Sequence, residues 1–412
     1  MAYASRPAAR DLRVDFFRGI ALVCMFWDHL PGNPLGLLTL RNFGLSDAAE
    51  LFVFLAGYGA MLAYGRLYLR DGYFAGATRL LRRAWILYVA HIFLLAQLMA
   101  VVFFANEHVH TRDFIGEMGL GYFLESPQHA LLAGVLMQFK PVLMDPLPLY
   151  VLLMTAMAGV LPLLVHRPMW VLLPSCLLWL FEKQLGLNLP AAPEGVWFFN
   201  PLAWQFLFFI GAVCARPAPF FRWRPVERRI AGWFALPFVA AFLLASLALV
   251  LSWRYPALHE LYMPPQVASL IYPISKTDLD LLRVVHFLAL AWLATWLLRP
   301  GRWLHSAPAA ALHCMGRHSL EVFCLSVLLA PMADAAGALA GDTWPVQVAS
   351  GLLGVLLMTL FAAWLDRLAA VRRRGPQASM SPPVLSSAAM RPRGGATNIP
   401  VGAVASPIRT RS

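Results

Sequence analysis

Ten apolar stretches alternate along the chain with short segments that are rich in arginine and other polar residues. A helix that crosses a membrane needs about 20 mainly apolar residues. The stretches lie at 14–32, 48–69, 84–105, 146–165, 169–187, 200–215, 231–253, 281–298, 318–339 and 346–369. A weaker stretch at 128–139 predicts a short partial or interfacial helix. The pattern predicts an all-α, polytopic membrane protein with about ten transmembrane helices.

The basic residues predict how these helices are oriented, because cytoplasmic loops of membrane proteins carry an excess of Lys and Arg. If ten spans alternate, five arginine groups fall on one side of the membrane. These groups lie at 6–13, 66–83, 216–229, 299–317 and 372–374. The opposite side receives few basic residues: Arg41, Arg112, Lys140, Lys183, Arg254 and Lys276. Both termini are therefore predicted to be cytoplasmic.

Three regions follow from this orientation. Residues 1–13 form a basic cytoplasmic N-terminus, and residues 14–374 form the membrane domain. Residues 375–412 are rich in Pro, Ser, Gly and Arg, so they predict a disordered basic cytoplasmic tail. The first apolar stretch carries charges and lacks a small-residue cleavage site, so we expect it to be retained as a mature helix.

Composition excludes several classes of protein. The chain has 412 residues, of which 60% are hydrophobic and 13% charged, whereas soluble domains carry about 25% charged residues. The net charge of +12 is spread between apolar stretches, so we predict no nucleic-acid partner. The five cysteines lie in or beside apolar stretches without metal-type spacing, which predicts buried thiols and no metal site.

The first apolar stretch contains the most informative pattern in the chain. DFFRGIALVCMFWDH, residues 15–29, carries Asp15, Arg18, Asp28 and His29. An ionisable side chain at membrane depth costs about 2.5–3.5 kcal/mol on insertion scales, and is usually functional. Arg18 and His29 are eleven positions apart, about three helical turns or roughly 16 Å. They predict a lined path on one helix face, with His29 as a catalytic base or an acyl carrier.

A second polar cluster opens the stretch at 48–69. Asp47 followed three residues later by Glu50 is typical of a capping box at a helix start. An alternative is functional: at the depth of His29, either carboxylate could orient the imidazole as the acid does in a catalytic triad. We therefore treat Asp47 and Glu50 as candidate catalytic residues.

A third cluster is KTDLDLLRVVH, at the start of the stretch at 281–298. Spacings of four and three residues place Lys276, Asp280 and Arg283 on one face of a helix, and His286 follows three residues later. One interpretation is a structural Asp280–Arg283 pair at the interface. The other is a polar face that lines the cavity used by His29, where Lys276, Arg283 and His286 would bind an anionic acyl group or developing oxyanion charge.

Four further residues are candidates for binding. Tyr150 follows the rigid segment DPLPLY, and Trp204 and Gln205 begin the stretch at 200–215. All three are candidates for substrate binding, although Trp204 could be an interfacial anchor and Gln205 an interhelical hydrogen-bonding residue. Arg317 precedes a cytoplasmic helix start and could contact a phosphate, or could simply be a basic helix flank.

One chemistry accommodates these features. A cytoplasmic acyl-coenzyme A would place its phosphates near Arg18 and neighbouring arginines, and its extended arm would reach towards His29. His29 would then activate an acceptor hydroxyl directly or carry the acyl group in a relay. The alternatives are a transporter or exporter of a glycan or small anion, in which intramembrane charge is also expected, and a non-catalytic membrane scaffold.

Five motifs carry a resemblance to a known family. In chain order they are RVDFFRGIALVCMFWDH, GLSDAAELFVFLAGY, DPLPLYVLL, FNPLAWQFLFFIG and KTDLDLLRVVHFLALA. The chain resembles the OpgC family, named for succinylation of osmoregulated periplasmic glucans, and the wider acyltransferase-3 superfamily, whose Arg-to-His spacing Arg18 and His29 match. Ala56 departs from the family pattern, where serine is expected.

The resemblance implies about ten helices in a bacterial inner membrane. It also implies a cytoplasmic acyl-coenzyme A donor, such as succinyl-coenzyme A, and a periplasmic glucan or other glycan as acceptor. Arg18 and His29 would serve donor handling and transfer. Six further candidates lie in family-like motifs: Asp47, Glu50, Tyr150, Gln205, Arg283 and His286.

Overall fold

The structure is a computed structural model that describes residues 11–216, 225–299 and 301–374. Three predictions lie wholly or partly outside these ranges: most of the basic N-terminus, part of the arginine group at 216–229, and the tail at 375–412. The chain divides into two units, residues 1–367 and 368–412. The described part of the second unit is limited to residues 368–374, the last residues of the helix Trp344–Arg374.

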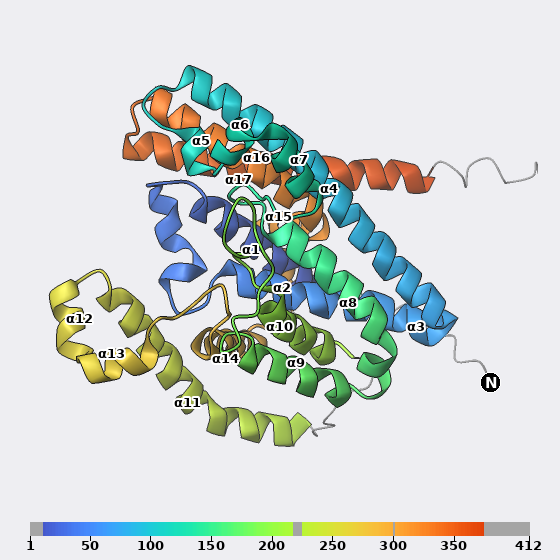
Figure 1. The fold of residues 1–412 in the computed structure, drawn as a ribbon. Helices are drawn as coiled ribbons and strands as arrows, with labels where there is room; N and C mark the ends of the chain where they lie inside the picture. The colour runs from blue at the N-terminus through green and yellow to red at the C-terminus, as the bar shows by residue number, and fades with distance from the viewer. Residues whose placement is uncertain (1–10, 217–224, 300, 375–412) are drawn as a thin grey trace, which may run out of the picture. The chain divides into compact units, whose positions relative to one another are not determined.

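The regular secondary structure of the described residues is helical, with no β-strand, as the sequence predicted (Figure 1). Helices α1 to α9 are Leu12–Asp28, Ala48–Ala60, Arg66–Asp71, Tyr73–His108, Phe114–Glu117, Gly121–Glu125, Pro127–Val135, Pro146–His166 and Met169–Phe181. Helices α10 to α17 are Pro201–Cys214, Pro225–Ser252, Pro256–Tyr262, Pro265–Ile271, Leu281–Leu297, Ala307–Arg317, Ser319–Leu339 and Trp344–Arg374.

Six of the described helices are long and apolar enough to cross a membrane. They are Ala48–Asp71, Tyr73–His108, Pro146–His166, Ala231–Ser252, Ser319–Leu339 and Trp344–Arg372. The other four predicted spans correspond to α1, α9, α10 and α14, which have 13 to 17 residues. The protein is therefore an all-α membrane protein, and the count of ten stays a prediction.

Two predicted boundaries differ from the structure. The stretch predicted at 84–105 belongs to α4, which begins eleven residues earlier at Tyr73 and has 36 residues. Hydropathy marks only the apolar part of this helix, because its first three turns carry arginines. The partial helix predicted at 128–139 is α7, which ends at Val135.

Large apolar side chains on several long helices face outwards. On α4, Trp85 and Phe93 are more than 60% exposed, and on α11 the same holds for Phe234 and Phe238. Soluble monomers rarely expose such apolar surface. In a membrane protein these side chains are in contact with lipid, so the exposed faces agree with the membrane assignment.

Reciprocal glycines bring the central helices close together. A Cβ atom on Gly57 of α2 would overlap the carbonyl oxygen of Phe208 in α10, and one on Gly211 of α10 would overlap that of Phe54 in α2. Small residues at an interface let two membrane helices approach closely. The α2–α10 contact fixes α2, whose first turns carry several of the candidate site residues.

The segment that contains α2 changes its helical geometry midway. A π-helical turn, Met61–Gly65, separates α2 from α3. Such turns are frequent at functional sites, because the extra residue per turn shifts the direction of the side chains. Ala63 and Tyr64 of this turn line a cavity of about 210 Å³.

Candidate active site

A cavity of about 520 Å³, which we call the histidine cavity, lies where the C-terminal end of α1 meets the first turns of α2 and α8. His29, at the C-cap of α1, contributes to its wall. The backbone N–H of His29 donates to Met25 and Phe26, and this fixes the residue at the helix end. Its Nδ1 is buried and makes no hydrogen bond with a described residue. The imidazole is thus a positioned side chain whose Nδ1 is not committed to another group of the described chain.

Charged side chains of both signs surround His29 in this cavity. The carboxylates belong to Asp28, Asp47 and Asp145, and the cations to Arg41, Lys140 and Lys276. The Asp28 carboxylate accepts a hydrogen bond of 2.6 Å from the Thr39 hydroxyl. The remaining wall is largely apolar and includes the rings of Phe198 and Phe199.

Asp47 and Glu50 form the predicted capping box at the start of α2. The Asp47 side chain accepts from Ala49 N at 2.8 Å, and the Glu50 carboxylate accepts from Asp47 N at 2.9 Å. The capping interpretation is thereby confirmed. Neither carboxylate hydrogen-bonds His29, although Asp47 shares the cavity wall with it. An orienting role for Asp47 or Glu50 stays a prediction.

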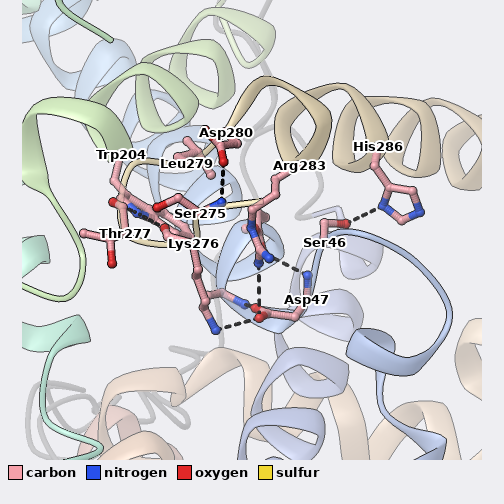
Figure 2. Close-up of polar contacts among 12 residues, drawn as sticks. Ser46, Asp47, Trp204, Ser275, Lys276, Thr277, Leu279, Asp280, Arg283 and His286 are labelled. Carbon is pink, nitrogen blue, oxygen red and sulfur yellow. Dashed lines mark hydrogen bonds and ion pairs between the residues drawn. The ribbon is translucent and has the colours of Figure 1, made fainter. Parts of the chain in front are cut away.

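Both carboxylates also bind cations from the segment that precedes and begins α14, as Figure 2 shows around Asp47. Lys276 Nζ lies 2.6 Å from Asp47 Oδ2, and a guanidinium nitrogen of Arg283 lies 3.3 Å from the same oxygen. Arg283 also lies 2.6 Å from Glu50, whose side chain is fully buried. The four residues form one compact ion-pair network, which we call the Asp47 network.

The prediction that Lys276, Asp280 and Arg283 share one face of a helix is wrong. Helix α14 begins at Leu281, and Lys276 lies in a turn in which Leu279 has a φ of +49°. Within that turn the Ser275 hydroxyl donates to the Asp278 carboxylate at 2.9 Å and accepts from Asp278 N at 3.1 Å. Such side-chain bonds to nearby backbone compete with helix formation.

The Asp280–Arg283 pair proposed as one interpretation does not form. The Asp280 carboxylate binds Lys183 at 3.0 Å and accepts a hydrogen bond from Ser275 N, whereas Arg283 binds the two acids of the Asp47 network. Arg283 lies outside the residues that line the histidine cavity, and only Lys276 of this cluster contributes to its wall.

Three candidate binding residues occupy structural positions behind the wall. Trp204 is fully buried, and its indole donates to the carbonyls of Lys276 and Thr277 at 3.1 and 3.2 Å (Figure 2). Gln205 bonds Ser175 of α9 through both ends of its amide, at 2.5 and 2.9 Å. His286 Nδ1 lies 2.8 Å from the Ser46 hydroxyl. Substrate contact by these three residues stays a prediction.

A second cavity of about 210 Å³, which we call the arginine cavity, is lined by three guanidinium groups, those of Arg18, Arg83 and Arg317. Arg18 donates to the carbonyl of Leu55 at 2.7 Å and lies 3.7 Å from the Asp15 carboxylate. Its guanidinium fits because Gly59 has no side chain there. Arg317 pairs with Asp366 at 3.0 Å. This cavity is suited to an anionic ligand.

The two cavities share two wall residues, Phe52 and Tyr150. Their rings lie 5.5 Å apart, and a third ring, that of Phe323, lies 6.3 Å from Phe52. The Tyr150 hydroxyl is buried and has no hydrogen-bond partner among the described residues. A buried polar group normally has a partner, so an unpaired hydroxyl at the junction of two cavities is suited to bind a ligand that passes between them.

Several wall residues were not among the candidates from the sequence. Lys140 and Asp145 come from the long segment between α4 and α8, and Arg83 comes from the first three turns of α4. Burial raises the pKa of Asp145 to about 6, although Lys140 acts in the opposite direction. The signal for Asp145 was its place before the rigid Pro-Leu-Pro segment. Lys140 carried no periodic signal, because it lies in an irregular turn.

A search for metal sites among the described residues finds no group of three or more His, Cys, Asp or Glu side chains that could hold an ion. Comparison with known proteins gives one result. The family described as OpgC protein matches residues 10–370. The chain belongs to the OpgC family. The resemblance drawn from the five motifs is thereby confirmed. No curated protein and no solved structure matches the chain.

Proposed function

We propose that this OpgC-family protein is a membrane O-acyltransferase. It moves an acyl group, succinyl, from cytoplasmic acyl-coenzyme A to a hydroxyl of a periplasmic glucan. The protein would lie in a bacterial inner membrane with both termini in the cytoplasm. One observation carries the proposal: a cavity lined by three arginines and a cavity that contains an uncommitted histidine share the Tyr150 and Phe52 side chains.

The arginine cavity would hold the phosphates of the donor. Guanidinium groups bind phosphate through paired, charge-assisted hydrogen bonds. Arg18 and Arg317 each have a carboxylate near them, whereas Arg83 has no ion pair with a described residue. A phosphate would supply the charge that balances Arg83, so we expect Arg83 to make the strongest of the three contacts.

The arm of the donor would then extend past Tyr150 towards His29. Arg18 lies in the first half of α1 and His29 at its C-cap, about 16 Å apart at roughly 1.5 Å per residue. An extended acyl-pantetheine arm is long enough to cover that distance. This arrangement separates the charged part of the donor from the thioester, which would reach the histidine cavity.

In the transfer step the acceptor hydroxyl oxygen attacks the thioester carbonyl carbon. His29 takes the hydroxyl proton as general base, and Tyr150 donates a hydrogen bond to the carbonyl oxygen as its negative charge develops. The C–S bond then breaks, the new ester C–O bond remains, and the proton passes from His29 to the departing thiolate. The products are acylated glucan and free coenzyme A, with no other reactant.

Reconstituted vesicles test this proposal. Purified protein in vesicles would receive labelled succinyl-coenzyme A on one face and unmodified glucan on the other. We expect label to appear on the glucan as an ester that mild base removes. Intact donor or glucan crossing the membrane without ester formation would instead support a transporter and overturn the proposal.

Tyr150→Phe tests the role of the junction. Removing one oxyanion donor typically lowers kcat by about 100-fold or more, and we expect a loss of about that size with little change in the donor KM. The phenyl ring keeps the packing against Phe52, so the fold should survive. Tyr88→Phe is a matched control, because the Tyr88 hydroxyl donates to Val135 O away from both cavities.

Arg83→Gln tests donor binding. Loss of one charge-assisted contact of about 1.5–3 kcal/mol should raise the KM for acyl-coenzyme A by about tenfold or more. The KM for the corresponding acyl-pantetheine, which lacks the nucleotide phosphates, should stay unchanged. Arg79→Gln is the control on the same helix, because Arg79 is exposed and lines neither cavity. An equal rise for both donors would contradict phosphate binding at Arg83.

A further inference from the structure

Of the three cations on the wall of the histidine cavity, two form an ion pair with a carboxylate. Lys276 lies 2.6 Å from Asp47, and Arg41 lies 3.7 Å from Asp28. Lys140 forms no ion pair with a described residue. Its ammonium instead donates to the carbonyl of Met137 at 3.4 Å and lies 3.9 Å from the centre of the Trp197 ring. These contacts neutralise its charge only in part.

The surroundings of Lys140 favour an anionic ligand. Burial lowers the pKa of its ammonium to about 8, and the nearby Asp145 opposes this effect. Trp197 itself is 3% exposed, so the ring fixes the ammonium against a rigid surface. A carboxylate placed beside Lys140 would remove much of the cost of holding a charge in this partly buried position.

We propose that Lys140 binds the terminal carboxylate of a dicarboxylic acyl group and so selects succinyl over uncharged acyl groups of similar length. This inference rests on the proposed function. Lys140 and His29 line the same cavity, whose volume of about 520 Å³ accommodates a four-carbon acyl group together with a sugar hydroxyl. Arg283, a candidate for this role from the sequence, is already balanced by Asp47 and Glu50.

Lys140→Met, Lys140→Gln and Lys140→Arg test the assignment in reconstituted vesicles. The measured quantity is the ratio of kcat/KM for succinyl-coenzyme A to that for butyryl-coenzyme A, with unmodified glucan as acceptor. This ratio does not depend on the fraction of active protein. We expect Lys140→Met and Lys140→Gln to lower this ratio by about 10- to 100-fold, the range for a charge-assisted hydrogen bond. Lys140→Arg should retain most of the wild-type ratio.

Lys276→Met provides the comparison within the same cavity. This variant removes the cation that pairs with Asp47 rather than one that binds a substrate carboxylate. It should therefore lower kcat/KM for both donors by the same factor and leave their ratio unchanged. An unchanged ratio in Lys140→Met and Lys140→Gln would overturn the assignment while leaving acyl transfer intact. If the wild type transferred neither donor, the proposed function itself would fail, and the inference with it.

The carboxylate could also come from an acceptor that already carries a succinyl group. Butyryl transfer to succinylated and unmodified glucan separates the two sources. The assignment predicts the same effect of Lys140→Met on both acceptors. A loss confined to the succinylated acceptor would contradict binding of the donor's carboxylate.

Discussion

His29→Ala should lower glucan acylation by about 10²–10⁴-fold, the range over which general acid–base catalysis contributes. Donor binding should be unaffected, because the arginine cavity does not contain His29. Single-turnover acyl transfer and equilibrium binding of a non-hydrolysable acyl-coenzyme A measure the two effects separately. The imidazole Nδ1 makes no hydrogen bond with a described residue, so the fold should tolerate removal of the side chain.

His129→Ala is the matched control for this variant. His129 is an exposed residue of α7 that lines neither cavity, and its replacement should leave turnover unchanged. Turnover of His29→Ala within a few-fold of the wild type would remove His29 from the chemistry. It would also leave the proposed transfer step without its general base.

Arg283→Met should destabilise the protein by about 3–5 kcal/mol, because it leaves the buried Glu50 carboxylate without its cation. Glu50 is fully buried and Arg283 nearly so. The midpoint of thermal unfolding in a single detergent measures the effect. The double variant Arg283→Met with Glu50→Gln should recover much of the loss, since it removes the buried charge together with its partner.

Arg70→Met is the control for the Arg283 variant. Arg70 pairs with Asp71 at 2.7 Å on an exposed helix end, and exposed pairs contribute little to stability. We expect no measurable shift of its unfolding midpoint. If Arg283→Met were as stable as the wild type, the Asp47 network would not hold α14 against α2.

Local patterns predicted part of the site. The capping box of Asp47 and Glu50 formed as expected, because its bonds join residues three apart at a helix start. Arg18 and His29 could be predicted because they belong to one helix, in which a spacing of eleven residues places both side chains on nearly the same face. In the structure these two residues line the two cavities that share Tyr150.

Contacts between distant segments could not be predicted in the same way. Lys140 reaches the histidine cavity because the irregular segment between α7 and α8 lines that cavity together with residues 191–199, and no periodicity in the sequence records this arrangement. Lys276 was wrongly placed on a helix, because its spacing to Arg283 is compatible with a turn as well. The hydroxyl of Ser275 decides between the two by bonding Asp278 within that turn.

Apolar patterns predicted where helices lie along the chain better than they predicted the lengths of these helices. Hydropathy is averaged over a window of residues, so it placed the start of one apolar stretch at residue 84, whereas the helix begins at Tyr73. It also gave equal weight to α9 and α10, which have only 13 and 14 residues in the structure. The lengths depend on Pro, Asn and Gly at the helix ends and on packing between helices.

Mass spectrometry of periplasmic glucans tests the central claim most directly. The comparison requires cells that contain the wild-type protein, the His29→Ala protein or none, with both proteins shown to be present in the membrane. We expect an added succinyl mass on the glucans of wild-type cells alone. Identical glucans in all three strains would contradict acyl transfer to a glucan through His29.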